Sequence, residues 1–147
     1  MSSGAKGLVL DTNVLISAAI FPHSMAARTL SLAFASCRLY RSQETFQEVL
    51  SVLNRAKFDR YFVDPVFTRA MFLDIYERYT MEVAVTHVCT ECVDPKDNIF
   101  LSLAVSAGAE IIVSGDKAHV LSMHPYRGID ILSLADFYRL MTQDTPL

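Results

Sequence analysis

Short apolar runs alternate along this sequence with longer segments whose apolar residues recur at helical spacing. The runs cover residues 7–10, 38–40, 83–85, 111–113 and 129–132, and the helical patterns cover residues 12–20, 25–37, 42–53, 55–79, 98–107 and 134–141. Strands that are separated by helices predict a parallel sheet, because parallel neighbours need crossover connections that place helices on both faces. The expected fold class is α/β, with three layers in the order α/β/α around a central parallel sheet.

Polar residues and breakers mark where these helices should begin and end. Ser24, Ser42 and Ser133 precede helical patterns and are expected to cap them, since a serine hydroxyl accepts a hydrogen bond from the first turn. The segment 55–79 should hold one short and one longer helix, with Pro65 in the first turn of the longer one. Gly108 is expected in the left-handed conformation that ends the helix over 98–107.

Composition limits the class of protein. The 147 residues are expected to form a single domain over residues 1–147, and their 52% hydrophobic content is typical of a folded globule. A formal net charge of -3 leaves no overall basic excess, so any nucleic-acid contact must be local. No stretch approaches the roughly 20 apolar residues that span a bilayer, so we expect a soluble, cytoplasmic protein without membrane contact.

Four acidic residues fall where the predicted fold would bring them together. Asp11 and Asp116 directly follow apolar strands, Asp97 opens a helix that runs back along the sheet, and Glu48 lies on the helix after the second strand. Ligands of open α/β sheets bind beyond the carboxyl ends of the strands. Clustered carboxylates repel one another unless a cation joins them, and Mg²⁺ and Mn²⁺ prefer carboxylate oxygens. The pattern therefore predicts a metal site.

Each acid also has an ordinary structural interpretation. Asp11, Asp97 and Asp116 all precede helices, and aspartate is among the best helix N-caps. Glu48 alone would be a helix-surface acid. Asp94 is either a secondary metal residue or a turn residue before a proline, and the two interpretations have about equal weight. The prediction of a site depends on the joint pattern.

With their neighbours, these acids resemble the PIN-domain family over nearly the whole chain. The matching segments are LDTNVLISA at residues 10–18, EVL at 48–50, DPKDNIFLSLA at 94–104 and GAEIIVSGDK at 108–117. The resemblance, nearest to the small prokaryotic VapC-like toxins of toxin–antitoxin pairs, implies a PIN fold and a metal-dependent endoribonuclease acting on single-stranded RNA. It implies catalytic and Mg²⁺- or Mn²⁺-binding roles for Asp11, Glu48, Asp97 and Asp116, with a protein antitoxin as partner.

Further residues near the acids are candidates for substrate binding. Thr12 and Asn13 follow Asp11 and could orient it or contact RNA, although Asn13 could equally satisfy backbone groups in the turn. Lys117 is the best placed cation, because it adjoins Asp116 and could guide the RNA backbone. The other candidates for phosphate contacts are Arg28, Arg38, Arg41, Arg55, Lys57, Arg60 and Lys96.

The sequence has three other interpretations. The Cys89–Cys92 pair lacks the second ligand pair of a structural zinc site, so free thiols are expected there and at Cys37. The chain could instead be a PIN-like RNA-binding or assembly module without catalysis, although a degenerate module would be expected to lose one of the acids. A receiver-like or phosphatase domain is disfavoured, because no second acid stands two residues after Asp11.

A homodimer is also expected. The apolar helical residues over 66–79 exceed what a small domain can hide, and members of the resembled family commonly pair. The aromatic residues of the segment 58–79 should therefore form core or a dimer face and should not form base-stacking platforms.

Overall fold

The computed structural model describes residues 5–115 and 118–143. Five strands in these ranges form one sheet in the order β3-β2-β1-β4-β5, and all neighbours run parallel. The strands are β1 (Gly7–Leu10), β2 (Arg38–Arg41), β3 (Thr80–Glu82), β4 (Ile111–Ser114) and β5 (Asp130–Ser133). The helices are α1 (Thr12–Ile20), α2 (Met25–Ser36), α3 (Gln43–Leu53), α4 (Arg69–Arg78), α5 (Asn98–Ala107), α6 (Ala118–Leu121) and α7 (Leu134–Gln143), with 3-10 helices η1 (Ala56–Tyr61) and η2 (Pro95–Asp97).

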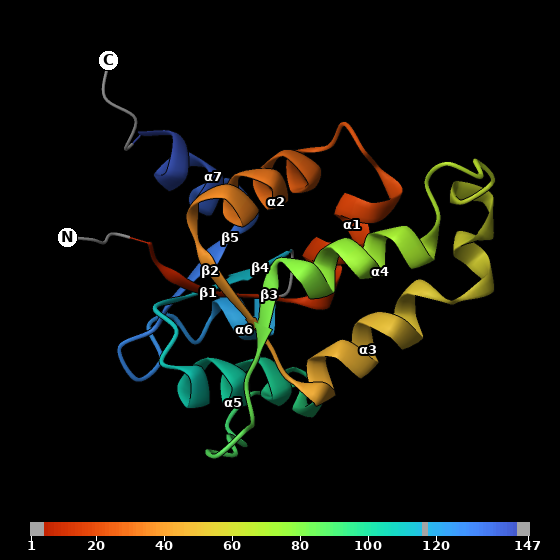
Figure 1. The fold of residues 1–147 in the computed structure, drawn as a ribbon. Helices are drawn as coiled ribbons and strands as arrows, with labels where there is room; N and C mark the ends of the chain where they lie inside the picture. Colours follow the sequence, from red (N-terminus) through yellow and green to blue (C-terminus); the bar gives the residue numbers. More distant parts are fainter. Residues whose placement is uncertain (1–4, 116–117, 144–147) are drawn as a thin grey trace.

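Alternate residues of the central strand β1 face two separate cores. Leu8 and Leu10 pack in a cluster with α1, α2, α3, α4 and α7 on one face of the sheet, whereas Val9 packs with α5 and α6 on the other. Figure 1 shows α5 on one side of the sheet, with α2 and α7 on the opposite side. Continuous apolar strands such as β1 are expected in a sheet that is buried on both faces. The three-layer α/β/α architecture is therefore confirmed.

The predicted caps are confirmed where local chemistry determines them. Ser24 accepts from Ala27 N, Ser133 accepts from Asp136 N, and Ser42 forms a reciprocal capping box with Thr45. Gly108 ends α5 in the left-handed region at φ 69°. These contacts fix where α2, α3, α5 and α7 begin or end, and hence where the neighbouring strand ends lie.

Two predicted element boundaries are wrong. The strand expected over 83–85 lies instead at Thr80–Glu82, because the chain pairs with β2 directly after α4, with Leu39 opposite Thr80. Pro65 does not lie in a first helical turn. It belongs to a turn ahead of α4, and Thr68 caps that helix through Met71 N. Nonlocal pairing and a better cap determine the two boundaries.

The thiols and aromatic residues follow expectation in outline. Cys37, Cys89 and Cys92 are free, although the last two are buried in the second core and are not exposed loop thiols. Burial raises the pKa of the Cys92 thiol, which keeps it protonated and unreactive. Phe72 and Tyr76 lie in the first core, so α4 hides much of the apolar surface that the sequence displays. No helix in the described ranges has the length and apolarity to span a membrane.

Candidate functional site

Asp11 lies at the end of β1, where the order of the strands across the sheet reverses. The strands β2 and β3 extend from one side of β1, and β4 and β5 extend from the other, so the end of β1 beside β4 is the topological switch point. Asp11 directly follows β1, and its backbone N–H donates to Val113 O at 3.0 Å. In open parallel sheets this is where ligands bind.

The Asp11 carboxylate is fully buried, and donors among the described residues bind both of its oxygens. Oδ1 accepts from Val14 N at 3.1 Å, which caps α1. Oδ2 accepts from Ser114 Oγ at 2.6 Å and from Gly115 N at 3.2 Å. The capping interpretation is thus correct for Asp11, but the second oxygen is bound by the end of β4. The carboxylate therefore links the end of β1 to the end of the neighbouring strand β4.

Glu48 approaches the same edge from α3. It is half-buried, and its Oε2 accepts from Thr12 Oγ1 at 3.0 Å. Thr12 is buried and immediately follows Asp11. This hydrogen bond links the Glu48 carboxylate to the first turn of α1, directly after the end of β1.

Asp97 and Asp94 stand at the two ends of η2. Asp97 is buried, with 1% of its surface exposed, and although it occupies the N-cap position of α5, its side chain makes no capping hydrogen bond there. Asp94 is half-buried and caps η2 through Lys96 N at 3.1 Å. The capping interpretation therefore fails for Asp97, whereas Asp94 makes the local hydrogen bond of a turn residue before Pro95.

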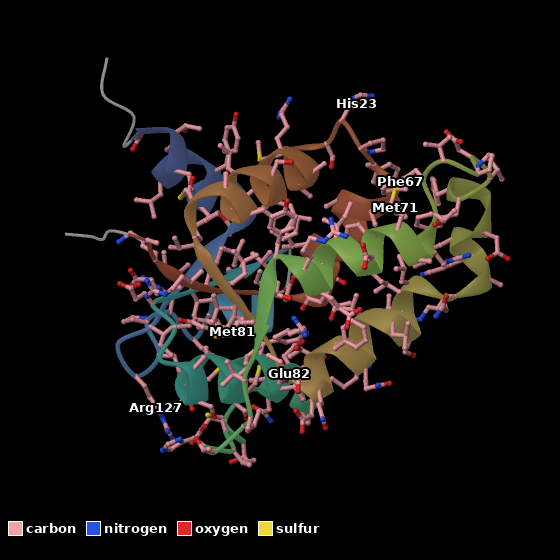
Figure 2. All side chains as sticks on the ribbon, viewed as in Figure 1. His23, Phe67, Met71, Met81, Glu82 and Arg127 are labelled. Atoms are coloured by element: carbon pink, nitrogen blue, oxygen red, sulfur yellow. The ribbon has the colours of Figure 1, made fainter. Side chains whose placement is uncertain are left out.

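The loop that leads to these two acids is anchored to α5 and to the segment that precedes β5. Cys92 N donates to Asn98 Oδ1 at 2.9 Å, and Cys89 N donates to Ser102 Oγ at 2.8 Å. Tyr126 Oη donates to Glu91, and this hydrogen bond lowers the pKa of the Glu91 carboxyl. Arg127, labelled in Figure 2, adds an ion pair to Glu91 at 3.5 Å. The approach to Asp94 and Asp97 is thus fixed by hydrogen bonds from both sides.

Two predicted site residues, Asp116 and Lys117, lie outside the described residues. Among the described ones, no three His, Cys, Asp or Glu side chains gather closely enough to hold a metal ion. The chemistry of the described donors fits a hard divalent cation, because Asp11, Glu48 and Asp97 offer carboxylate oxygens and no sulfur or imidazole. A complete ligand set from this chain would thus need Asp116 as well.

A cleft of about 290 Å³ opens beside Glu48 and Asp94, whereas the buried Asp11 and Asp97 are not among its lining residues. Its walls include Thr12, Asn13, Glu48 and Asp94, together with the cations Arg55 and Lys96. Asn13 is exposed, and its amide forms no hydrogen bond with another described residue, so it does not serve the turn as an ordinary Asn would. The cleft therefore combines acids with two cations and an available amide.

The structure separates the candidate phosphate-binding cations into two groups. Arg55 and Lys96 line the cleft, and Lys57 lines an adjoining cavity. The others lie elsewhere. Arg41 binds Thr80, Arg38 binds Ala5 O, Arg28 lies 6.0 Å from the Tyr138 ring centre and Arg60 lies 4.9 Å from that of Tyr61. A local basic rim thus accompanies the acids in a chain of negative net charge.

Sequence reasoning missed Ser114, the fully buried residue whose hydroxyl binds Asp11. A serine at the end of an apolar strand, two residues before an acid, was the available signal. It also missed Asn98 and Ser102, whose side chains accept from the loop backbone at Cys92 and Cys89. On a helix pattern these residues resemble ordinary surface positions, so only the fold shows their role.

Comparison with known proteins agrees with this architecture. The chain matches the family model described as PIN domain over residues 7–118. VapBC2 from Rickettsia felis, crystallised bound to a DNA fragment from their promoter, shares the fold with a TM-score of 0.58, 15% identity, and coverage of 86% of this chain and 98% of that chain. PAE2754 from Pyrobaculum aerophilum gives a TM-score of 0.56 at 12% identity, covering 97% of this chain and 94% of that chain.

At such low identities the two solved structures show a shared fold and no more. No curated protein matches the sequence. The family match spans well over half of the chain, and it includes β1, α3, η2 and β4, the elements that carry or adjoin the described acids. The chain belongs to the PIN-domain family, whose members are generally metal-dependent nucleases.

Proposed function

We propose that this protein is a metal-dependent endoribonuclease that hydrolyses phosphodiester bonds of single-stranded RNA. The observation that carries the proposal is the placement of buried Asp11 at the switch point of the sheet, near a cleft that is lined by Glu48, Asp94, Arg55 and Lys96. Acids at such a position suit a divalent cation, and cations on the rim suit a phosphate backbone.

The acids and their neighbours would have different roles in catalysis. Asp11, Glu48, Asp97 and Asp116 would hold Mg²⁺ or Mn²⁺, with Asp94 as a further acid at the rim. A divalent ion there supplies activation of the attacking water and neutralisation of charge on the scissile phosphate. Ser114 and Gly115 hold the Asp11 carboxylate in place, and Thr12 does the same for Glu48.

Substrate contacts come from the other cleft residues. Arg55 and Lys96 would bind phosphate oxygens, and Lys117 would extend this basic rim. The Asn13 amide and any spare hydrogen-bonding capacity of Thr12 would orient the RNA near the acids. No protein nucleophile is required, because water attacks, so the products should carry 5′-phosphate and 3′-hydroxyl ends.

The direct test is cleavage of labelled single-stranded RNA with Mg²⁺ or Mn²⁺ and with excess EDTA. We expect cleavage only with the metal, and none by the Asp97→Asn variant. Undiminished cleavage in EDTA, or products with 2′,3′-cyclic phosphate ends, would refute the mechanism. The end groups can be read by mass spectrometry of the fragments.

A non-catalytic RNA-binding or assembly module is the second candidate. It is favoured by one observation, that the described acids do not by themselves form a three-residue metal group. Calorimetry separates the two functions, since the nuclease requires saturable Mn²⁺ binding that Asp97→Asn weakens. RNA binding without any Mn²⁺ binding would favour the module.

We further propose a cellular setting that follows from the VapC-like resemblance. The chain would act as a single-domain cytoplasmic toxin held inactive by a protein antitoxin, and it would form a homodimer. Exposed apolar side chains near α4 and β3 support an interface between copies, namely Val63, Val66, Met71, Tyr79 and Met81; Met71 and Met81 are labelled in Figure 2. Light scattering at micromolar concentration tests the dimer, and a monomer would contradict it.

A further inference from the structure

A second cavity adjoins the cleft of the acids and has no part in the chemistry proposed above. It has a volume of about 440 Å³ and shares Asn13, Val52 and Arg55 with the cleft, so the two hollows are neighbours along that wall. A cavity of this size lies within the usual range for small ligands or ligand parts. A molecule bound along the shared wall can therefore contact both hollows.

The lining of the cavity is polar and apolar in about equal parts. Its apolar wall consists of Val14, Ile16, Ile20, Val52, Phe58 and Leu134. Asn13 and Ser17 lie on the same face of α1, since residues four apart on a helix are neighbours. Neither side chain forms a hydrogen bond with another described residue, so both can serve a ligand. Apolar surface with a few hydrogen-bonding groups is what a flat heteroaromatic ring requires.

The charge at the rim is positive. Arg55 and Lys57 line the cavity, and neither forms an ion pair with another described residue. The nearby acid Asp59 is already paired with Arg69 at 2.9 Å. Lys57 Nζ lies 5.2 Å from the centre of the Phe58 ring, so a cation and an aromatic ring occur together at this wall. An anionic backbone with attached rings matches this combination better than an apolar peptide does.

The position relative to the acids limits which part of a substrate would enter. Asp11 caps α1, and the cavity residues on that helix run from Asn13 to Ile20. Seven residues of α-helix rise about 10 Å, so the cavity begins next to the acids and ends about that far away. This is the region that nucleotides adjacent to a phosphate held at the acids would occupy.

We propose that this cavity is a nucleobase subsite, which takes the base of a nucleotide flanking the scissile phosphate of single-stranded RNA. Phe58 and the aliphatic residues contact the ring, Asn13 and Ser17 hydrogen-bond to its edge, and Arg55 and Lys57 bind the neighbouring phosphates. The proposal deepens the RNA-cleaving function and rests on it for the direction of the chain. It predicts that the protein discriminates among bases at one position beside the cleaved bond.

Binding by the metal-free protein tests the subsite without relying on catalysis. A fluorescent 12-nucleotide single-stranded RNA is compared by anisotropy, at low salt and in EDTA, with versions that each lack the base at one position. We expect removal of the base to weaken binding about tenfold or more at one position, since an aromatic contact to a base has that order of effect. Removal elsewhere should change binding less than about twofold.

Two variants connect that position to the cavity, and a third is their control. Ser17→Phe fills the cavity and should bind the intact RNA about as weakly as wild type binds the RNA that lacks the critical base. It should also become insensitive to the missing base. Phe58→Ala removes part of the wall without overpacking and should reduce the same discrimination. Ser31→Phe makes the matched change on an exposed position of α2 and should behave as wild type.

Circular dichroism melting establishes that each variant folds, and if Ser17→Phe does not, Phe58→Ala decides. Three results would overturn the subsite and leave the cavity to another occupant, such as a protein side chain. These results are an equal small effect at every position, unchanged base discrimination in the folded variants, and no RNA binding by wild type. Base discrimination without any cleavage would support the subsite and refute the nuclease. Cleavage without base discrimination would do the reverse.

Discussion

The substitution Glu48→Gln separates a metal-binding acid from a structural one. Glu48 is half-buried on α3, and its one described side-chain hydrogen bond is the one that it accepts from Thr12 at 3.0 Å. Glutamine keeps an oxygen that can accept this bond, and its helix propensity is similar. The change removes one negative charge near Asp11. We therefore expect the metal-free protein to keep its melting temperature or gain slightly.

The effect of metal should differ between the two proteins. At Mn²⁺ about 100-fold above its dissociation constant, linkage stabilises the wild type by about 2.7 kcal/mol. In a chain of 147 residues, 1 kcal/mol corresponds to about 2–4 °C, so Mn²⁺ should raise the wild-type melting temperature by about 5–11 °C. If Glu48 is a metal ligand, its loss should weaken Mn²⁺ affinity at least about tenfold, which removes about 1.4 kcal/mol or more of the stabilisation by Mn²⁺. The rise in melting temperature with Mn²⁺ should then be smaller by about 3–6 °C.

Melting curves with Mn²⁺ and with EDTA measure both quantities on the same samples. Glu44→Gln is the matched control, because it makes the same change one turn earlier on α3 at an exposed residue outside the cleft. It should keep the full Mn²⁺ shift and full RNA cleavage. If Glu48→Gln also keeps both, Glu48 is a surface acid, and the assignment of the site at the end of β1 is wrong.

Three further predictions follow from particular contacts. Asp11→Asn should abolish cleavage and also lower the free energy of unfolding of the metal-free protein by about 1–3 kcal/mol, because the NH₂ group of an amide cannot accept a hydrogen bond and so cannot replace the second carboxylate oxygen that binds Gly115 N while the first binds Val14 N. Urea unfolding measures this, and unchanged stability would contradict the described hydrogen bonds. Burial raises the pKa of Tyr76 from 10.0 to about 12. The unfolded chain therefore loses this proton first, and stability should be complete below pH 10 and fall by about 3 kcal/mol as pH rises to 12. Tyr76→Phe should lessen this alkaline loss, and an identical pH profile in the variant would contradict it. Lys57→Gln should weaken binding to all RNA sequences and reduce the slope of log affinity against log salt by about 0.7, as measured by anisotropy; an unchanged slope would remove Lys57 from the phosphate contacts.

The sequence determines the parts of this fold that depend on local chemistry. Capping by Ser24 and Ser42 and the left-handed Gly108 involve residues within a few positions of each other, so the pattern predicts them correctly. The strand β3 depends on pairing with β2, and its residues are half-buried or exposed at the edge of the sheet. The apolar run at 83–85 has a stronger strand pattern than residues 80–82, so the predicted strand begins three residues after the observed one.

The same division between local and distant contacts applies to the site. From sequence, Asp11 and Asp97 are equivalent, because each precedes a helix and could be an ordinary cap. The fold distinguishes them: Asp11 caps α1 and also binds Ser114, whereas Asp97 is buried at the start of α5 without capping it. Burying a carboxylate costs free energy that hydrogen bonds or a cation must offset. Capping of α5 therefore does not account for the burial of Asp97, and Mn²⁺ calorimetry of Asp97→Asn tests the cation-binding role that we propose for it.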